Sequence, residues 1–326
     1  MTISCTPFRI SFVGGGTDIE AFFRNHGGAV ISSSINKYMY ISAHPFFEPE
    51  RIRLKYSKTE TVSTLSEVQH PLFRKVLTHF NLFKGIEVSS IADIISNTGM
   101  GSSSSFTVGL LHNLSAYTNS AFEPEQLAQL AYRIEKSVNA RIGMQDHYAA
   151  SFGGLNLFEF SMNNTVKVTP IKIRNSFKEK LNRNLVLVYI GQRKTSALKL
   201  QKNQASDVYN EKKNQCLLAM KSLVYKFKVA LENEDEKAIG VLLHENWVLK
   251  KQLGSVSSYK VDELYQLGLH CGASGGKLLG AGLGGFLLFY CDSKWQIALK
   301  ESFVKRGHRV IDFQFENHGS QILLHR

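Results

Sequence analysis

The sequence predicts an α+β fold divided into two domains. The chain has 326 residues, and a typical domain contains roughly 150. Short stretches of alternating apolar and polar residues, typical of strands, occur in both halves, together with longer stretches that have apolar residues at helical spacing. A polar, basic stretch at 174–183 contains few apolar residues, and we place the boundary there, with domains at 1–180 and 181–326.

The elements expected in the first domain begin with the strand at 7–13, where Phe8, Ile10 and Phe12 alternate with polar residues. Six further strands are expected, at 28–34, 37–44, 51–56, 85–92, 154–160 and 165–173, on the basis of Val-, Ile- and Tyr-rich alternation. Helices are expected at 19–25, 71–81, 102–118 and 124–140, and residues 57–69 are expected to form a surface loop. Pro124 suits the first position of its helix.

The second domain is expected to mix the same kinds of element. Strands are expected at 184–190, 286–291, 308–315 and 321–325, and helices at 206–232, 235–253, 260–271 and 293–306. No apolar run approaches the roughly 18 residues of a membrane span. The first residues lack the basic and apolar segments of a signal peptide, so we expect a cytoplasmic protein. The four cysteines are scattered and fit neither a zinc site nor a disulfide framework.

The net charge of +12 is compatible with nucleic acids or with phosphorylated small molecules. No long basic tract occurs, and the aromatic residues lie mostly within apolar patterns instead of alternating with Lys and Arg. A phosphorylated small molecule is therefore favoured over nucleic acid, and we expect no nucleic-acid or membrane partner.

The first strand ends in a glycine turn. Arg9 lies on the opposite face from Phe8, and the turn Gly14-Gly15-Gly16-Thr17-Asp18 follows. Such a turn places the carboxylate of Asp18 beside an open backbone surface. Asp18 could also cap the short helix at 19–25, and the two roles are compatible.

A second turn combines glycine with serine. The stretch 97–105 reads Asn-Thr-Gly-Met-Gly-Ser-Ser-Ser-Ser and leads into a helix. Glycine lets the backbone approach a ligand, and the free N–H groups at a helix N-terminus attract anions. One serine is enough to cap a helix, so four in succession after two glycines favour a phosphate site.

Two acidic residues lie near this turn in the sequence. Glu135 borders the apolar face of the helix at 124–140, where a carboxylate is costly unless it is paired or binds a cation. Asp146 follows eleven residues later, next to His147. One acid could bind Mg²⁺ and the other could handle a proton. On spacing alone Glu135 could equally be an edge residue that reaches solvent, and a single histidine is more often structural.

A basic loop and a third glycine stretch complete the candidate site. Arg193 and Lys194 follow an apolar strand and could contact an anion or simply face solvent. The stretch 275–285 contains Gly280-x-Gly282-x-x-Gly285, which matches a dinucleotide fingerprint literally. These glycines lead into a strand, not a helix, so we reject nicotinamide binding. The phosphate-binding loop of P-loop nucleotidases is also absent.

Together the three stretches resemble the GHMP kinase family, with the motifs in family order over nearly the whole chain. The matching segments are Thr6-Pro7-Phe8-Arg9-Ile10 with Gly14–Asp18, then Gly99-Met100-Gly101-Ser102-Ser103, and then 277–285. The triple-glycine turn and the segment 145–154 look most like the branch of D-glycero-D-manno-heptose 7-phosphate kinases. One departure is Asn97, where the family commonly has glycine; asparagine tolerates the left-handed region, so we expect the turn to be preserved.

The resemblance implies a fold with an N-terminal ribosomal-protein-like βαβ domain and a C-terminal ferredoxin-like α/β sandwich. It implies transfer of a phosphoryl group from ATP, with Mg²⁺, to the anomeric hydroxyl of the heptose phosphate, giving the 1,7-bisphosphate for activated heptose and surface polysaccharide. The resemblance assigns the nucleotide phosphates to Asn97, Gly99, Met100, Gly101, Ser102, Ser103 and Ser104. Ser103 and Glu135 would hold Mg²⁺. Asp146 would act as base, beside Arg9 as a fixed positive charge.

For the substrate, the resemblance implies Gly15, Gly16, Thr17, Asp18, Gly282 and Gly284, and we assign its distal phosphate to Arg193 and Lys194. A kinase of the same fold acting on unphosphorylated fucose or galactose is the first alternative. A basic nucleic-acid-binding protein is another, because half of this fold resembles a ribosomal protein. A pseudokinase is a third, which the presence of Ser103, Glu135 and Asp146 opposes. The sequence leaves monomer and homodimer both open.

Overall fold

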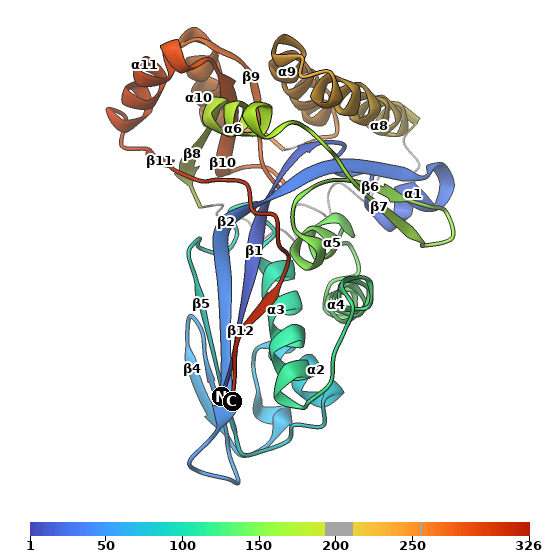
Figure 1. Cartoon of the computed structure of the whole chain (residues 1–326), viewed down its shortest axis with the longest axis vertical. Helices are drawn as coiled ribbons and strands as arrows, with labels where there is room; N and C mark the ends of the chain where they lie inside the picture. The colour runs from blue at the N-terminus through green and yellow to red at the C-terminus, as the bar shows by residue number, and fades with distance from the viewer. Residues whose placement is uncertain (193–210, 255) are drawn as a thin grey trace.

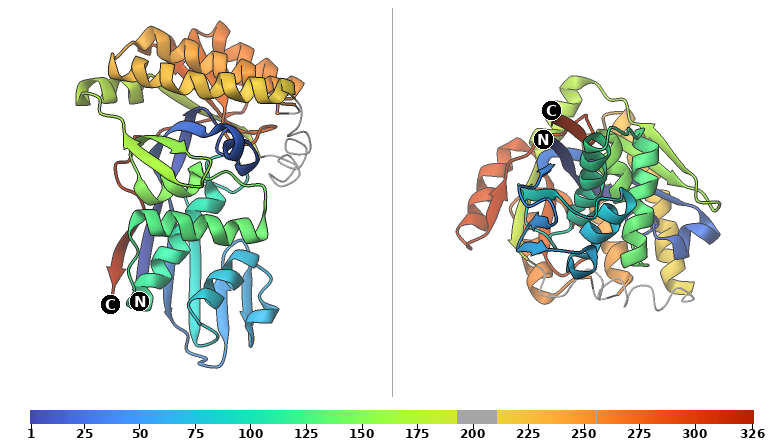
Figure 2. Two further views of the ribbon diagram at one scale, coloured as in Figure 1. Left: turned by 90° about the vertical axis from the view of Figure 1, so that its right-hand side faces the viewer. Right: turned by 90° about the horizontal axis from the view of Figure 1, so that it is seen from below.

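The computed structural model describes residues 1–192, 211–254 and 256–326. Within these residues the chain forms two stacked units, each built on its own sheet (Figure 1). The first unit is the larger and contains both chain ends shown in the figure, while the helices of the second unit lie over its far end (Figure 2). Among the described helices, none is both long and apolar enough to cross a membrane.

The larger sheet has eight strands among the described residues, and two of them are long. Its strands are β1 (Thr2–Val13), β2 (Gly28–Pro45), β3 (Ile52–Lys55), β4 (Thr59–Val62), β5 (Ile86–Ala92), β6 (Leu155–Phe160), β7 (Val166–Pro170) and β12 (Gln321–His325). The order is β12-β1-β2-β5-β3-β4, and β6 pairs with both β2 and β7. The first half of β2 pairs with β6 and its second half with β5, so one strand joins two parts of the sheet.

Helices cover one side of this sheet. They are α1 (Glu20–His26), η1 (Leu65–Glu67), α2 (Pro71–His79), α3 (Ser102–Tyr117), α4 (Pro124–Val138) and α5 (Gln145–Phe152). Helix α3 packs on β1 and β2, and α4 packs on both α3 and α5. This arrangement brings the beginning of α3, the end of α4 and the beginning of α5 together near the second unit.

The smaller sheet has four antiparallel strands in the described part of the chain, in the order β11-β8-β10-β9. Its strands are β8 (Leu185–Gly191), β9 (Ala273–Leu278), β10 (Gly285–Cys291) and β11 (Arg309–Ile311). The helices of this second unit are α6 (Asn175–Asn184), α8 (Glu211–Glu232), α9 (Glu236–Gln252), α10 (Tyr259–His270) and α11 (Ser293–Val304). Helix α8 packs against α9 and also against β1 and β2, so it joins the two units.

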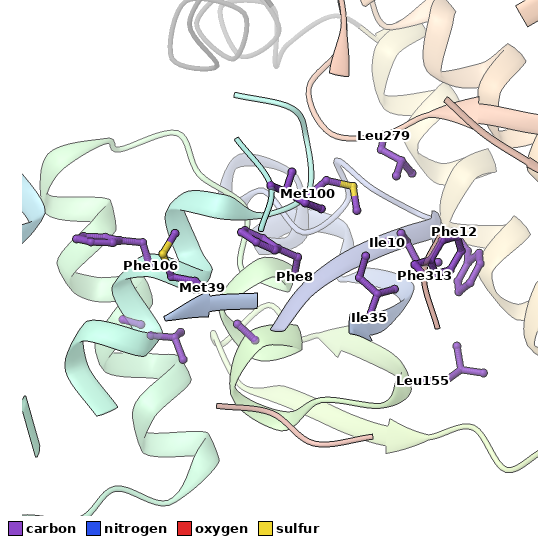
Figure 3. Close-up of a cluster of buried hydrophobic side chains, with 14 of the residues drawn as sticks. Phe8, Ile10, Phe12, Ile35, Met39, Met100, Phe106, Leu155, Leu279 and Phe313 are labelled. Atoms are coloured by element: carbon purple, nitrogen blue, oxygen red, sulfur yellow. The ribbon is translucent and has the colours of Figure 1, made fainter. Parts of the chain in front are cut away.

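The hydrophobic core continues from one unit to the other. In Figure 3, Phe8, Ile10 and Phe12 of β1 extend through a cluster that reaches Leu279 of the second unit. The ring of Phe12 also stacks on Phe227 of α8, with centroids 5.5 Å apart. The alternation that predicted the first strand therefore reflects burial against both units.

Several expected elements differ from the structure. The strands expected at 28–34 and 37–44 are one continuous strand, β2. The loop expected at 57–69 contains β4 and η1. No element was expected in the polar, basic stretch 174–183, where we placed the domain boundary, yet it forms α6, which buries Phe177 and Leu181 one turn apart. The first part of the glycine stretch 275–285 is strand β9.

Candidate functional site

A pocket of about 330 Å³ lies where the two units meet, within the size range of small-molecule sites. Its wall includes residues from all three glycine-containing stretches, together with three acidic and three basic residues. The polar and glycine residues that line it include Arg9, Ser11, Gly15, Gly16, Asp18, Asn97, Gly99, Gly101, Ser102, Ser103, Ser104, Glu135, Gln145, Asp146, Lys250, Lys277 and Gly280. Most of the residues that the sequence singled out therefore share one cavity.

The serine turn has the geometry of an anion site. Asn97, Gly99 and Gly101 all have positive φ, at 62°, 84° and 76°, so the prediction for Asn97 is confirmed. Gly101 is the N-cap of α3 and, having no side chain, makes no capping hydrogen bond to the first turn of this helix. The N–H groups of that turn are therefore available to an anionic ligand, and the 16-residue helix directs its positive end at the pocket.

Met100, by contrast, does not line the pocket. Its side chain is fully buried beside Phe8 in the core (Figure 3). Its carbonyl oxygen accepts a hydrogen bond from the N–H of Arg9 at 3.3 Å. Met100 therefore anchors the turn to β1, and its side chain makes no contact with the cavity.

The third glycine stretch packs against the serine turn. A Cβ on Gly280 would lie 2.3 Å from the Cα of Gly99, and a Cβ on Gly285 would lie 2.1 Å from the carbonyl oxygen of Thr98. Only glycine allows this crossing. Gly282 and Gly284 do not line the pocket, contrary to the substrate-binding role expected of them; Gly282 packs on the backbone of Val256.

Arg9 and Asp146 form a bidentate ion pair in the pocket. The guanidinium donates from Nε to Oδ1 of Asp146 at 2.8 Å and from Nη2 to Oδ2 at 2.9 Å. Its Nη1 donates to the carbonyl oxygen of Gly99 at 2.6 Å. The side chain of Arg9 is 5% exposed and that of Asp146 is 24% exposed, so the carboxylate remains accessible from the cavity. One arginine thus links the acid of α5 to the serine turn.

Glu135 is buried and paired, which rules out the edge position that its spacing allowed. Its Oε2 lies 2.7 Å from Nε2 of His147 and accepts a hydrogen bond from the hydroxyl of Ser104 at 3.1 Å. Burial raises the pKa of Glu135, but the adjacent His147 and the hydroxyls of Ser103 and Ser104 outweigh it, so the net pKa lies below its usual value. An ionised carboxylate beside Ser103 is a suitable ligand for a divalent cation.

Asp18 serves the pocket and does not cap α1. The N-cap of that helix is Ile19, which has no side-chain cap. Oδ1 of Asp18 accepts from the N–H of Gly16 at 2.9 Å, and Oδ2 accepts from the N–H of Gln145 at 3.3 Å. Burial, and then the charge of Asp146, raise the pKa of Asp18. The two backbone N–H donors hold its carboxyl group in the pocket wall.

Thr17, predicted as a substrate ligand, is fully buried and does not line the pocket. Its hydroxyl lies 2.8 Å from the carbonyl oxygens of both Gly14 and Ala29 and accepts from the N–H of Ala29 at 3.0 Å. These contacts lock the turn onto β2. Arg193 and Lys194 lie outside the described residues.

Four polar residues of the pocket that sequence reasoning did not assign to the site bear on what it can bind. Ser11 Oγ and Gln145 Oε1 are buried without a hydrogen-bond partner among the described residues. They lie close together, because a Cβ on Gly15 would be 3.5 Å from Ser11 Oγ and 3.6 Å from Nε2 of Gln145. The other two are Lys250 and Lys277, which come from α9 and β9. Ser11 lies on the same face of β1 as Arg9, which is the signal that could have identified it.

Two family models match the chain: "GHMP kinases N terminal domain" at residues 67–154 and "GHMP kinases C terminal" at residues 227–306. Together the two ranges cover about half of the chain and include the serine turn, Glu135 and Asp146. The chain belongs to the GHMP kinase family. The predictions of this fold, with its N- and C-terminal domains, and of an ATP-dependent kinase are thereby confirmed.

Individual GHMP kinases are similar to the chain over most of its length. D-glycero-alpha-D-manno-heptose 7-phosphate kinase of Campylobacter jejuni is 28% identical and covers 96% of both chains. Galactokinase of Pyrococcus furiosus is 24% identical over 88% of both. Among solved structures, a D-glycero-D-manno-heptose 1-phosphate kinase from Bacteroides thetaiotaomicron superposes with a TM-score of 0.81 at 22% identity, covering 99% of both chains. That likeness concerns the fold.

Proposed function

We propose that this GHMP kinase transfers the γ-phosphoryl group of ATP to the anomeric hydroxyl of D-glycero-D-manno-heptose 7-phosphate, giving the 1,7-bisphosphate. The observation that carries the proposal is the bidentate Arg9–Asp146 pair, which links the serine turn to the half of the pocket lined by Ser11, Gly15 and Asp18. The similarity to the Campylobacter jejuni heptose 7-phosphate kinase supports the choice of substrate. The reaction would take place in the cytoplasm, where ATP is available. Its product would be a precursor of nucleotide-activated heptose for surface polysaccharide.

The serine turn would hold the nucleotide phosphates. Gly101, the N-cap of α3, offers no side-chain hydrogen bond to the N–H groups of this turn, and Gly99 and Gly280 have no Cβ that would collide with the facing turn. The residues therefore fit a phosphate chain by backbone donors and a helix N-terminus. We assign this role to Asn97, Gly99, Gly101, Ser102, Ser103 and Ser104.

We propose that Ser103 and Glu135 hold Mg²⁺ together with the nucleotide phosphates. Among the described residues, no group of three or more His, Cys, Asp or Glu side chains is arranged to bind a metal ion. Mg²⁺ commonly takes one or two protein ligands and completes its shell with phosphate oxygens and water, so a single ionised Glu135 beside a serine fits it. When bound, the metal neutralises charge that develops on the transferred phosphoryl group.

Asp146 would orient the acceptor hydroxyl and receive its proton. Phosphoryl transfer depends mainly on positioning and charge neutralisation, so the position of the carboxylate matters more than its strength as a base. Arg9 would keep that carboxylate in place, and its positive charge would stabilise the phosphoryl group during transfer. Asp18, Ser11 Oγ and Gln145 Oε1 would bind the other sugar hydroxyls, because the last two atoms are buried without a partner in the described part of the chain.

A substrate panel tests the proposal. The wild-type enzyme is incubated with Mg-ATP and with heptose 7-phosphate, heptose, galactose, fucose and mevalonate, and ADP release is measured. We expect kcat/KM to be highest for heptose 7-phosphate. Preferred turnover of a sugar without phosphate would contradict the substrate and favour the galactokinase-like alternative.

A further inference from the structure

Two buried lysines lie in the wall of the same pocket. Lys250 of α9 is 8% exposed and Lys277 of β9 is 2% exposed. Nζ of Lys277 donates to the carbonyl oxygen of Phe12 at 2.8 Å, and Nζ of Lys250 donates to the carbonyl oxygen of Gly280. Backbone carbonyl oxygens thus help to hold both ammonium groups in position. Burying an ammonium group such as that of Lys277 is costly unless a negative charge compensates it.

The charges around Lys277 have the same sign as its own. Among the described residues, no carboxylate lies within ion-pair distance of Lys277. Burial first, and then the charges of Lys250 and Arg9, hold the pKa of Lys277 well below its usual range. Of the acids in the pocket, Asp146 is already held by Arg9. This part of the wall therefore favours an anionic ligand.

We propose that Lys250 and Lys277 form the subsite for a phosphoryl group carried by the acceptor sugar. The inference rests on the proposed function and identifies the part of the site that selects a sugar phosphate over a free sugar. It replaces our assignment of that phosphate to Arg193 and Lys194 by residues with known positions. Ammonium groups bind phosphate as compact charges and need no special geometry.

The position of the pair supports the acceptor over the nucleotide. Lys277 reaches Phe12, two residues before Gly14, at the beginning of the turn that ends in Asp18. Asn246, one turn before Lys250 on α9, accepts a hydrogen bond from the N–H of Gly14 at 3.0 Å. Both lysines thus lie behind the turn that lines the acceptor half of the pocket. The nucleotide phosphates have their own donors in the serine turn.

Two other roles for the lysines make different predictions. Gly280, which Lys250 contacts, packs on Gly99 of the serine turn, so the phosphate could belong to the nucleotide. Alternatively, the lysines could only tie the units together, since the Lys277–Phe12 bond joins β9 to β1. If the lysines bind the nucleotide, replacing them changes the KM for ATP. If they only join the two units, replacing them changes the folding stability.

The test uses Lys250→Met and Lys277→Met, which keep an apolar stem and remove the charge, with the exposed Lys237→Met on α9 as matched control. KM and kcat are measured for heptose 7-phosphate, for heptose and for Mg-ATP. A lost hydrogen bond between charged groups costs enough to raise the KM for heptose 7-phosphate by about tenfold or more. We expect the KM for ATP and the kcat/KM for heptose to stay within about twofold of the wild-type values.

Any other pattern of KM and kcat changes in the two lysine variants overturns the inference. A higher KM for ATP with an unchanged KM for the sugar phosphate would assign the lysines to the nucleotide. Equal changes for all three substrates, or no change, would leave only a structural role. Failure of the proposed function is seen separately, because it appears in the wild-type enzyme as absent turnover of heptose 7-phosphate.

Thermal unfolding adds a readout that separates binding from a structural tie. Replacing a desolvated ammonium group by Met removes a buried charge, so the empty Lys277→Met enzyme should melt at a temperature no lower than wild type. A lower melting temperature with unchanged KM values would overturn the inference. If Lys277→Met does not fold, Lys250→Met is judged by the same KM criteria.

Discussion

At the scale of single residues, the chemistry depends on how carboxylates are held. Both oxygens of Asp146 accept hydrogen bonds from Arg9, whereas the carboxylate of Glu135 is held by His147 and serine hydroxyls. An arginine fixes its partner but cannot exchange a proton with it. These contacts suit the roles we propose, in which Asp146 binds the acceptor hydroxyl and Glu135 binds a cation.

Replacing Asp146 by Asn should abolish sugar-dependent ADP formation while leaving ATP binding intact. The amide keeps the shape of the side chain but cannot accept the proton, and general-base losses typically cost about 10²–10⁴ in rate. Single-turnover kinetics and ATP titration by fluorescence would measure the two properties. Asp312→Asn, an exposed acid between β11 and β12, is the control. Wild-type turnover in the Asp146 variant would exclude it as the base.

Glu135→Gln should raise the Mg²⁺ concentration needed for half-maximal rate by about tenfold or more, in the range typical of altered metal sites. Gln retains a hydrogen-bonding group for His147, so the packing of α4 on α5 is preserved. The rate is measured against Mg²⁺ at saturating ATP, with the exposed Glu179→Gln on α6 as control. If the Mg²⁺ dependence of the rate were the same in Glu135→Gln as in the wild type, Glu135 would have only a structural role.

Sequence reasoning identified residues whose role follows from local chemistry and missed those that depend on distant partners. Asn97 was expected in the left-handed region because of its side chain, and its φ of 62° agrees. The burial of Glu135 could not be predicted, because His147 reaches it from another helix. Lys277 was noticed only as a motif residue, since its contact with Phe12 spans 265 positions. Thr17, expected to bind the substrate, is instead buried with its hydroxyl bonded to Ala29 of β2, a contact that the sequence does not reveal.

At the scale of elements, the site is built where two glycine turns cross. The serine turn before α3 and the turn between β9 and β10 approach so closely that a Cβ on Gly99 would lie 2.5 Å from the carbonyl oxygen of Leu279. Each turn comes from a different unit, so their contact sets the width of the nucleotide half of the pocket.

Gly280→Ala should therefore lower both stability and ATP affinity more than Gly307→Ala. Both glycines have similar φ, 70° and 76°, so the backbone strain of alanine, about 1 kcal/mol, is shared. Only at Gly280 would the new Cβ also collide with Gly99, whereas nothing lies within 4 Å at Gly307. Denaturant unfolding and KM for ATP are the measurements. Equal losses in both variants would show that the crossing is not needed.

Element prediction failed where polar residues cover a short apolar stripe. Helix α6 was taken for a boundary because eight of its ten residues are polar or charged, yet Phe177 and Leu181 lie on one face and anchor it. That spacing of four was the available signal. In β9, the adjacent Gly275 and Gly276 suggested a loop. They are glycine because a Cβ would meet the backbone of α9 or of β10.

At the scale of the whole molecule, the pocket draws its wall from both units, and α8 packs on β1 and β2. We propose that the domain boundary lies near residue 180, with the final strand β12 returning to the first sheet. A ligand in such a pocket binds only when both units are folded and in contact.

Mg-ATP should therefore shift a single unfolding transition of the whole chain. At a concentration of about 100 times its Kd, a ligand that binds only the native state adds roughly 2.7 kcal/mol of stability. Differential scanning calorimetry with Mg-ATP, compared with adenosine as a control lacking phosphates, measures the shift. Two separate transitions, of which only one moves, would contradict coupled units.

The pairing of β1 with β12 has a consequence for biosynthesis. Thr2 pairs with His325, 323 positions away, so β1 is among the first segments to leave the ribosome while its outer neighbour is among the last of this chain. During translation the outer edge of β1 is left open for nearly the whole elongation time, with its backbone groups exposed to any other strand. Until β12 has been synthesised, that edge of β1 is therefore a site where pairing with a strand of another chain can compete with the native pairing.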